Sequence, residues 1–145
     1  MSIRDQMSKL IDSRYRLAAF ETNEPDRIVD VFRGISRDTG KAIYYWENGL
    51  GMYRLGSDHI LIPETARPRD ALSYIASASH FAIYLLRDLS DALLDSPKLV
   101  QQLTPIVEGK VAGDRRLVVL LGEDIRIPRG LKHNAVRVRH KLNAA

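Results

Sequence analysis

The apolar positions along the chain follow two different spacings, one typical of helices and one of buried strands. Five short apolar runs bounded by turn residues predict strands at 17–21, 42–47, 81–86, 117–121 and 136–139. Between them, apolar residues recur every three or four positions, which predicts helices over 2–13, 25–39, 69–76 and 96–107. Strands that alternate with helices indicate an α/β domain with a mostly parallel five-stranded sheet between two helical layers, a three-layer αβα fold.

Residues 48–67 interrupt this alternation. Two glycine-marked bends surround a short apolar piece, 59–62, which Pro63 closes. The segment is interpreted as a hairpin-like or loop insertion, and the pattern leaves its conformation open. In the last predicted strand, Val136 and Val138 alternate with Arg137 and Arg139, which predicts an edge strand whose arginines face solvent.

Composition agrees with one domain spanning residues 1–145. The chain has 45% hydrophobic and 28% charged residues, ordinary values for a globular protein. Because it has no cysteine, disulfides and thiolate zinc sites are excluded. The sequence contains neither a signal-peptide-like apolar run nor a stretch of about 20 apolar residues, so we expect a cytoplasmic location and no membrane partner.

The net charge of +4 is concentrated at one end of the chain. Taking the six basic residues of the last twenty from the total of 22 leaves 16 basic against 18 acidic residues in the remainder. A basic end of this kind indicates a surface for nucleic acid or for an acidic partner, although arginines on an edge strand also protect it from unwanted pairing. The candidate interaction residues are Arg126, Arg129, Lys132, Arg137 and Arg139, with Arg14 and Arg16 expected near the same edge.

Several short motifs occur in the order found in a known family. They are Ser13-Arg14-Tyr15, Glu21-Thr22, Asp26-Arg27, Trp46 and Gly49-Leu50, and the runs 82–103 and 116–131 continue the match. The chain thereby resembles the N-terminal region of the AAA-type ATPases of cyanobacteria and plastid genomes. The resemblance implies a degenerate P-loop fold, since in that family this region precedes the AAA module and resembles a P-loop domain that has lost its P-loop.

The residues of the first strand–helix turn agree with this expectation. A P-loop needs glycine-rich backbone amides, a lysine and a Ser or Thr at this place. Residues 21–26 read Glu-Thr-Asn-Glu-Pro-Asp, so glycine and lysine are missing and three carboxylates repel phosphate. We therefore predict no catalytic residues and no cofactor, and treat four positions as vestigial: Glu21, Thr22, Asp26 and Asp88.

Other candidate chemistry is sparse. Asp88 follows the third strand where a P-loop enzyme keeps a magnesium ligand, but capping or hydrogen bonding of the following turn is the simpler interpretation. The four histidines are scattered, so no metal site is expected. An aromatic group, Tyr44, Tyr45, Trp46 and Tyr53, offers a stacking platform for single-stranded nucleic acid; packing against the helical layers is the favoured interpretation.

These observations favour a non-catalytic interaction or regulatory module of an AAA-type ATPase, which acts by docking to another protein or to copies of itself. Three alternatives remain open. One is nucleic-acid binding through the basic end of the chain, another is weak nucleotide binding, and the third is an enzyme that uses Asp88 as a base or metal ligand.

Overall fold

The computed structural model describes residues 2–141 and contains one six-stranded sheet. The strand order is β3-β2-β4-β5-β1-β6, and every neighbouring pair is parallel except β2 and β3. The strands are β1 (Leu17–Thr22), β2 (Ile43–Glu47), β3 (Gly51–Arg54), β4 (Ala82–Arg87), β5 (Arg116–Gly122) and β6 (Ala135–His140). All five predicted strands are present, and β3 is the addition.

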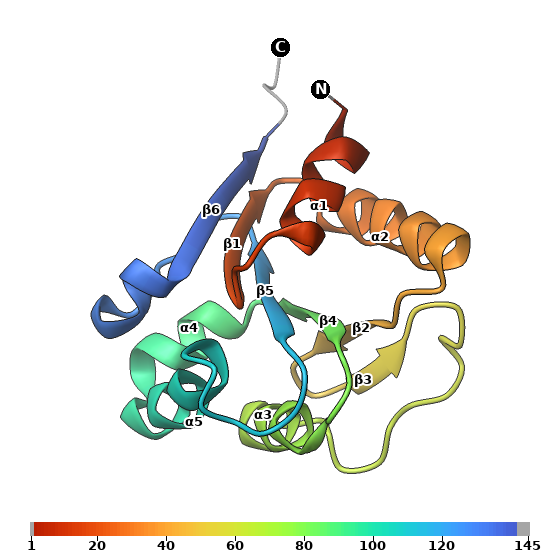
Figure 1. The fold of residues 1–145 in the computed structure, drawn as a ribbon. Helices are drawn as coiled ribbons and strands as arrows, with labels where there is room; N and C mark the ends of the chain where they lie inside the picture. Colours follow the sequence, from red (N-terminus) through yellow and green to blue (C-terminus); the bar gives the residue numbers. More distant parts are fainter. Residues whose placement is uncertain (1, 142–145) are drawn as a thin grey trace.

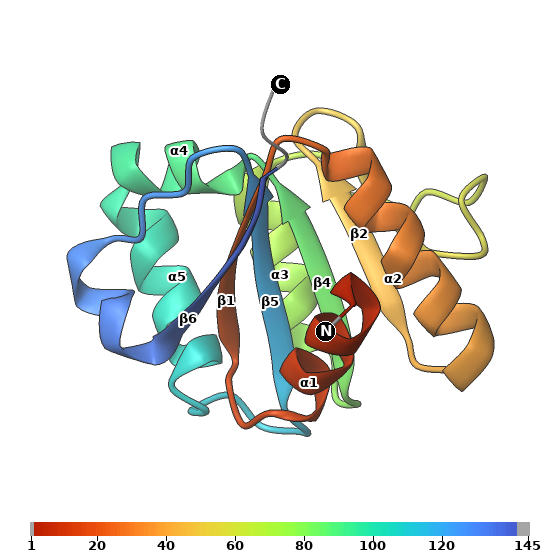
Figure 2. The same ribbon diagram turned by 90° about the horizontal axis from the view of Figure 1, so that it is seen from above.

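The helices cover both faces of this sheet, which confirms the three-layer αβα fold. In Figure 1, α1 and α2 lie above the sheet and α3, α4 and α5 lie below it, and Figure 2 shows the parallel strands between them. The helices are α1 (Ile3–Asp12), α2 (Pro25–Thr39), α3 (Pro68–Ser77), α4 (Leu89–Asp95) and α5 (Pro97–Val107), with a short 3₁₀ helix, η1 (Arg129–Asn134), before β6.

Local sequence explains where these helices begin and end. Proline occupies the first turn of α2, α3 and α5, where its missing N–H costs no hydrogen bond. Ser2 and Asp5 form a reciprocal capping box on α1. Gly40 adopts a left-handed conformation (φ 73°) and its N–H donates to the carbonyl of Ser36, which ends α2.

Alternate residues of each buried strand pack into two separate hydrophobic cores, one on each face of the sheet. Ala18 and Phe20 of β1 pack with α1 and α2, whereas Leu17 and Ala19 face α3, α4 and α5. The same alternation divides β2, where Tyr45 faces α2 and Trp46 is fully buried on the other side. Both faces of the central strands are apolar because helices cover both of them.

The uncertain segment 48–67 forms a hairpin with β2 and then folds back along β3. Trp46 donates its indole N–H to the carbonyl of Thr65 at 2.5 Å, and the Thr65 hydroxyl accepts the N–H of Met52 at 2.9 Å. A single antiparallel bridge joins Met52 to Ile62. The outer edge of β3 is thus occupied by the chain's own loop.

The prediction for the last strand is confirmed in position and in the exposure of its arginines. β6 is the edge strand, and Val136 and Val138 pack on the α1–α2 core. Arg137 and Arg139 are exposed, with 40% and 67% of their side chains accessible, and both also reach the buried carboxylate of Glu21, a contact that the pattern did not predict. An edge strand still has one neighbour, and here that neighbour supplies an acid.

Candidate functional site

The turn after β1 is the place where a P-loop fold would hold phosphate, and here its side chains are bound to the protein itself. Thr22 is fully buried, and its hydroxyl accepts the N–H of Glu24 at 2.9 Å. Asp26 pairs with Arg87 at 2.9 Å and Glu24 with Arg27 at 3.3 Å. The carboxylates of this turn are therefore satisfied by arginines of the same chain.

Glu21 is the most enclosed acid of this group. Only 6% of its side chain is exposed, and its Oε1 lies 2.9 Å from Nη1 of Arg137 and 3.2 Å from Nη2 of Arg139. Its other oxygen accepts the backbone N–H of Ile125 at 3.2 Å. Arg137 also donates to the carbonyl of Ile125 at 2.9 Å. One carboxylate thus connects β1, β6 and the segment after β5.

These contacts and burial have opposite effects on the pKa of Glu21. Desolvation alone would raise the pKa of Glu21, but the hydrogen bonds from Arg137, from the Ile125 amide and from Arg139 outweigh it and hold that pKa below its ordinary value. Glu21 is thus a carboxylate at neutral pH, and its charge would repel a phosphate group brought to the end of β1.

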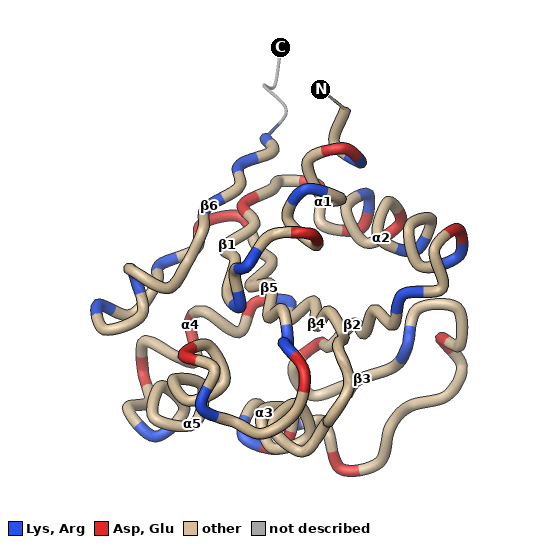
Figure 3. The backbone as a smooth tube through the Cα atoms, in the orientation of Figure 1, with Lys and Arg blue, Asp and Glu red and all other residues tan. Residues whose placement is uncertain are grey.

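The position of this cluster in the sheet matters for function. β1 lies between β5 and β6. After β1 the chain passes through α2 to β2, which lies on the β5 side of β1, whereas the last strand, β6, lies on the other side. Open α/β sheets bind ligands at the carboxyl ends of strands where the strand order reverses in this way. Figure 3 shows acidic positions at these ends of β1 and β5, opposite Lys and Arg along β6. The protein's own ion pairs occupy this place.

Asp88 follows β4 with a left-handed backbone (φ 60°) at the N-cap position of α4. Its side chain makes no capping hydrogen bond, so the expected cap is absent. Within the described residues 2–141, no three His, Asp or Glu side chains gather as a metal site would require. Asp88 therefore follows β4 where a P-loop enzyme has a magnesium ligand, but no further metal-ligating side chains of the described residues gather around it.

The predicted basic surface divides into two groups. Arg137 and Arg139 are engaged by Glu21, and Lys141 pairs with Asp124 at 2.9 Å. In contrast, three exposed residues before β6 form no ion pair with any residue that the structure describes: Arg126, Arg129 and Lys132. Arg14 and Arg16 line a small cavity with His133 and Asn134, so they do lie beside η1.

The aromatic platform considered from the sequence does not form. Tyr45 and Tyr53 pack together on the α2 side, with ring centroids 5.5 Å apart. Tyr44 lies on the opposite face, where Tyr74 and Tyr84 join it around a cavity that the sequence did not predict. The alternating pattern of β2 indicated that Tyr44 and Tyr45 diverge, but the strand order was needed to find the partners of Tyr44.

Two comparisons with known proteins bear on identity. No curated protein matches the chain. Among residues 2–141, no helix is both long and apolar enough to span a bilayer. The family model for the SpoVK-like AAA ATPase, N-terminal domain, matches residues 3–140, almost the whole chain and the whole of the sheet just described. The chain therefore belongs to the family of SpoVK-like AAA ATPase N-terminal domains.

Proposed function

We propose that this domain is a non-catalytic interaction module of an AAA-type ATPase, which works in the cytoplasm by docking to protein surfaces, including copies of itself. The observation that carries the proposal is the Glu21 cluster. A site that binds nucleotide needs amide and cationic donors free for phosphate, and here Arg137, Arg139 and the Ile125 amide are committed to a carboxylate. A degenerate P-loop fold, which lost phosphate binding and kept its sheet, accounts for this arrangement.

The narrower resemblance to the cyanobacterial and plastid ATPases belongs to the same proposal. It rests on Glu21-Thr22, Asp26-Arg27 and Trp46. In the structure these residues serve the fold, since Trp46 anchors the loop at Thr65 and Asp26 pairs with Arg87. Both contacts therefore have a structural role in this chain.

The docking surface we favour contains the three unpaired cations around η1. Arg126, Arg129 and Lys132 are exposed and stand on a short segment that projects beside β6, as Figure 1 shows for η1. Unpaired cations are available to carboxylates of a partner. The same cations favour the second candidate function, nucleic-acid binding, in which phosphates replace the carboxylates.

Two measurements on the purified chain test these functions. We expect calorimetric titration with ATP and Mg²⁺ to show no binding and light scattering to show concentration-dependent association at low salt. Arg129→Glu combined with Lys132→Glu should abolish that association, and Arg37→Glu on the distant face of α2 serves as the control.

The opposing results are equally definite. Saturable ATP binding or hydrolysis would overturn the non-catalytic assignment. A chain that stays monomeric but retards DNA or RNA at low salt, with the retardation lost in the Arg129 and Lys132 variant, would replace docking with nucleic-acid binding.

A further inference from the structure

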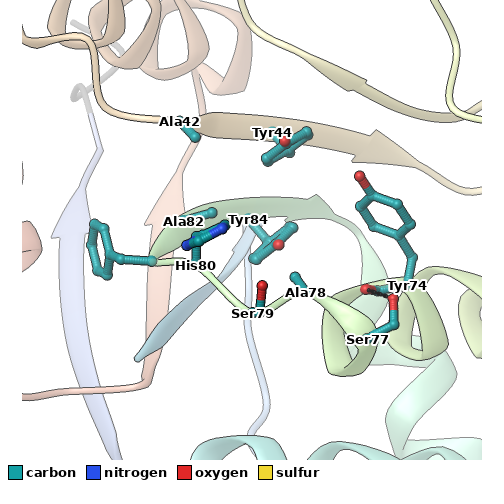
Figure 4. Close-up of a pocket in the computed structure, with 10 residues that line it drawn as sticks. Ala42, Tyr44, Tyr74, Ser77, Ala78, Ser79, His80, Ala82 and Tyr84 are labelled. Atoms are coloured by element: carbon teal, nitrogen blue, oxygen red, sulfur yellow. Dashed lines mark hydrogen bonds between the residues drawn. The ribbon is translucent and has the colours of Figure 1, made fainter. Parts of the chain in front are cut away.

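A second cavity lies at the opposite end of the sheet from Glu21, on the side covered by α3. Its volume is about 360 Å³. Figure 4 shows its walls, which come from the amino ends of β2 and β4, the last turn of α3 and the loop that follows. The residues on which the argument rests are Tyr44, Tyr74, Tyr84, Ser79 and His80, here called the tyrosine pocket.

Rigid elements hold the three tyrosine rings. Tyr44 and Tyr84 are register partners on β2 and β4, and their rings stack with centroids 5.2 Å apart and planes 14° apart. Tyr74 extends from α3 towards Tyr44, edge to face at 6.2 Å, as Figure 4 shows. Because strand pairing and a helix fix these positions, the aromatic wall exists before any ligand arrives.

The hydroxyl of Tyr84 has no partner within the protein. Tyr84 is only 1% exposed, and its hydroxyl makes no hydrogen bond to any residue in the described part of the chain. Burial raises the pKa of Tyr84, so the group remains an O–H donor throughout the physiological range. Among the described residues the Tyr84 hydroxyl is not one of the fully buried polar atoms that lack a partner, so solvent reaches it through the cavity. A ligand acceptor replaces that water.

The absence of acidic and basic side chains from the lining restricts the chemical class of ligand further. Of the described residues that line the tyrosine pocket, none is Asp, Glu, Lys or Arg. A charged ligand would lose hydration without gaining a counter-charge, and an aliphatic ligand would displace water from the Tyr84 hydroxyl without replacing its hydrogen bond. A neutral planar ring with hydrogen-bonding edges meets both demands, since aromatic side chains stack on such rings.

We propose that the tyrosine pocket binds an uncharged heteroaromatic ring of the nucleobase class, supplied by a free base or nucleoside. The volume of about 360 Å³ falls within the range of small-molecule sites. Without cationic residues in the lining, the pocket gives no support for a phosphate, so a nucleotide gains nothing over its nucleoside. The site is independent of the docking function and of the Glu21 end of the sheet.

The test is a titration of the ¹⁵N-labelled chain followed by amide chemical shifts. Adenosine, guanosine, cytidine and uridine are added in turn, with AMP to measure the effect of phosphate and indole to represent a protein side chain. We expect at least one nucleoside to shift Tyr44 and the amides of 74–84 saturably, and AMP to bind no more tightly than adenosine.

Two variants connect the binding to the pocket. Tyr84→Phe removes only the unpartnered hydroxyl and should weaken binding about fivefold, and Tyr74→Leu removes one aromatic wall and should weaken it about tenfold. Tyr53→Phe, which loses a hydroxyl on the other face of the sheet, should leave the affinity unchanged. The amide spectra of the variants report whether each remains folded.

The outcomes against the proposal are distinct. No saturable shift with any nucleoside, or equal affinity in Tyr84→Phe and the parent chain, would overturn it. Binding of indole alone would overturn it in favour of an aromatic side chain from a partner protein. AMP binding at residues 21–26 would contradict the non-catalytic docking function and leave the tyrosine pocket to be judged by the nucleosides.

Discussion

Nη1 of Arg137 lies 2.9 Å from Oε1 of Glu21, so the outermost strand of the sheet is fastened to the end of the first strand by an ion pair. The carboxylate is almost fully enclosed, whereas the arginine is 40% exposed. Such an arrangement lies between a surface pair, which contributes little, and a fully buried pair, whose disruption is costly. It converts a site expected for anion binding into a structural contact.

Removing the Glu21 charge should therefore destabilise the domain. Glu21→Gln keeps the shape of the side chain but leaves Arg137 and Arg139 without their counter-charge, and we expect a loss of about 1–3 kcal/mol in the free energy of unfolding. Urea denaturation measures it. Glu47→Gln is the matched control, because Glu47 is 45% exposed and its ion pair with Arg87 is long, at 3.8 Å. This substitution should lower the free energy of unfolding by less than about 0.5 kcal/mol.

The same ion pair predicts a pH dependence. The pKa of Glu21 is lower in the folded chain than in the unfolded chain, where it is about 4.3. A depressed folded pKa gives stability that is complete above the unfolded pKa and is lost as the pH falls through the folded pKa. The stability difference between the parent chain and Glu21→Gln should thus be constant from pH 5 to 7 and shrink below about pH 4. A difference that stays constant down to pH 3 would contradict the assignment.

Arg116 performs a different task at the other end of β5. It is 3% exposed, and its guanidinium donates to backbone carbonyls of Ile75, Ala76 and Ala112, the first and last at 2.8 Å. Two of these carbonyls, those of Ile75 and Ala76, lie in the last turn of α3, where carbonyls lack the usual partner four residues on. We expect Arg116→Met to cost roughly 2–4 kcal/mol in unfolding free energy, because a side chain of similar length supplies no donors.

Thermal or urea unfolding tests the role of Arg116, and Arg129→Met on the exposed face of η1 is the control. Arg116→Lys should recover only part of the lost unfolding free energy, since one ammonium group cannot donate to all the carbonyls that the planar guanidinium reaches. A Met variant as stable as the parent chain would mean that the charge and the hydrogen bonds of Arg116 are unimportant.

Some strands and contacts of this fold could be predicted from the sequence and others could not, for physical reasons. The buried parallel strands are continuous apolar runs, so their positions were evident. β3 is four residues long and contains Gly51 and Arg54, which resemble a loop, and only its pairing with β2 makes it a strand. Alternation placed Arg137 and Arg139 together on one face of β6, but their partner Glu21 lies on a strand more than a hundred residues earlier. Contacts of this kind depend on strand order, which periodicity does not encode.

Thr65 should control the loop that closes the edge of β3. Its carbonyl accepts the Trp46 indole N–H and its hydroxyl bonds both Met52 and Ile62. Thr65→Val retains the shape and the carbonyl but removes the hydroxyl, leaving the buried Met52 N–H without an acceptor, at a cost of about 1–3 kcal/mol. Hydrogen exchange should become faster at Met52 and across 55–66. Thr39→Val, at the exposed end of α2, should leave exchange in this loop unchanged.

The backbone of Asp88 gives the last prediction and separates two interpretations of that residue. A left-handed φ of 60° disfavours every residue with a Cβ, and glycine adopts it without strain. If Asp88 is only a structural remnant, Asp88→Gly should raise the free energy of unfolding by about 0.5–1 kcal/mol. Glu64, which has a φ of 57°, provides a matched site, and Glu64→Gly should give a similar gain. A loss of stability in Asp88→Gly would mean that the side chain supports the fold. A stabilisation of the parent chain by Mg²⁺ that the variant lacks would restore Asp88 as a functional carboxylate.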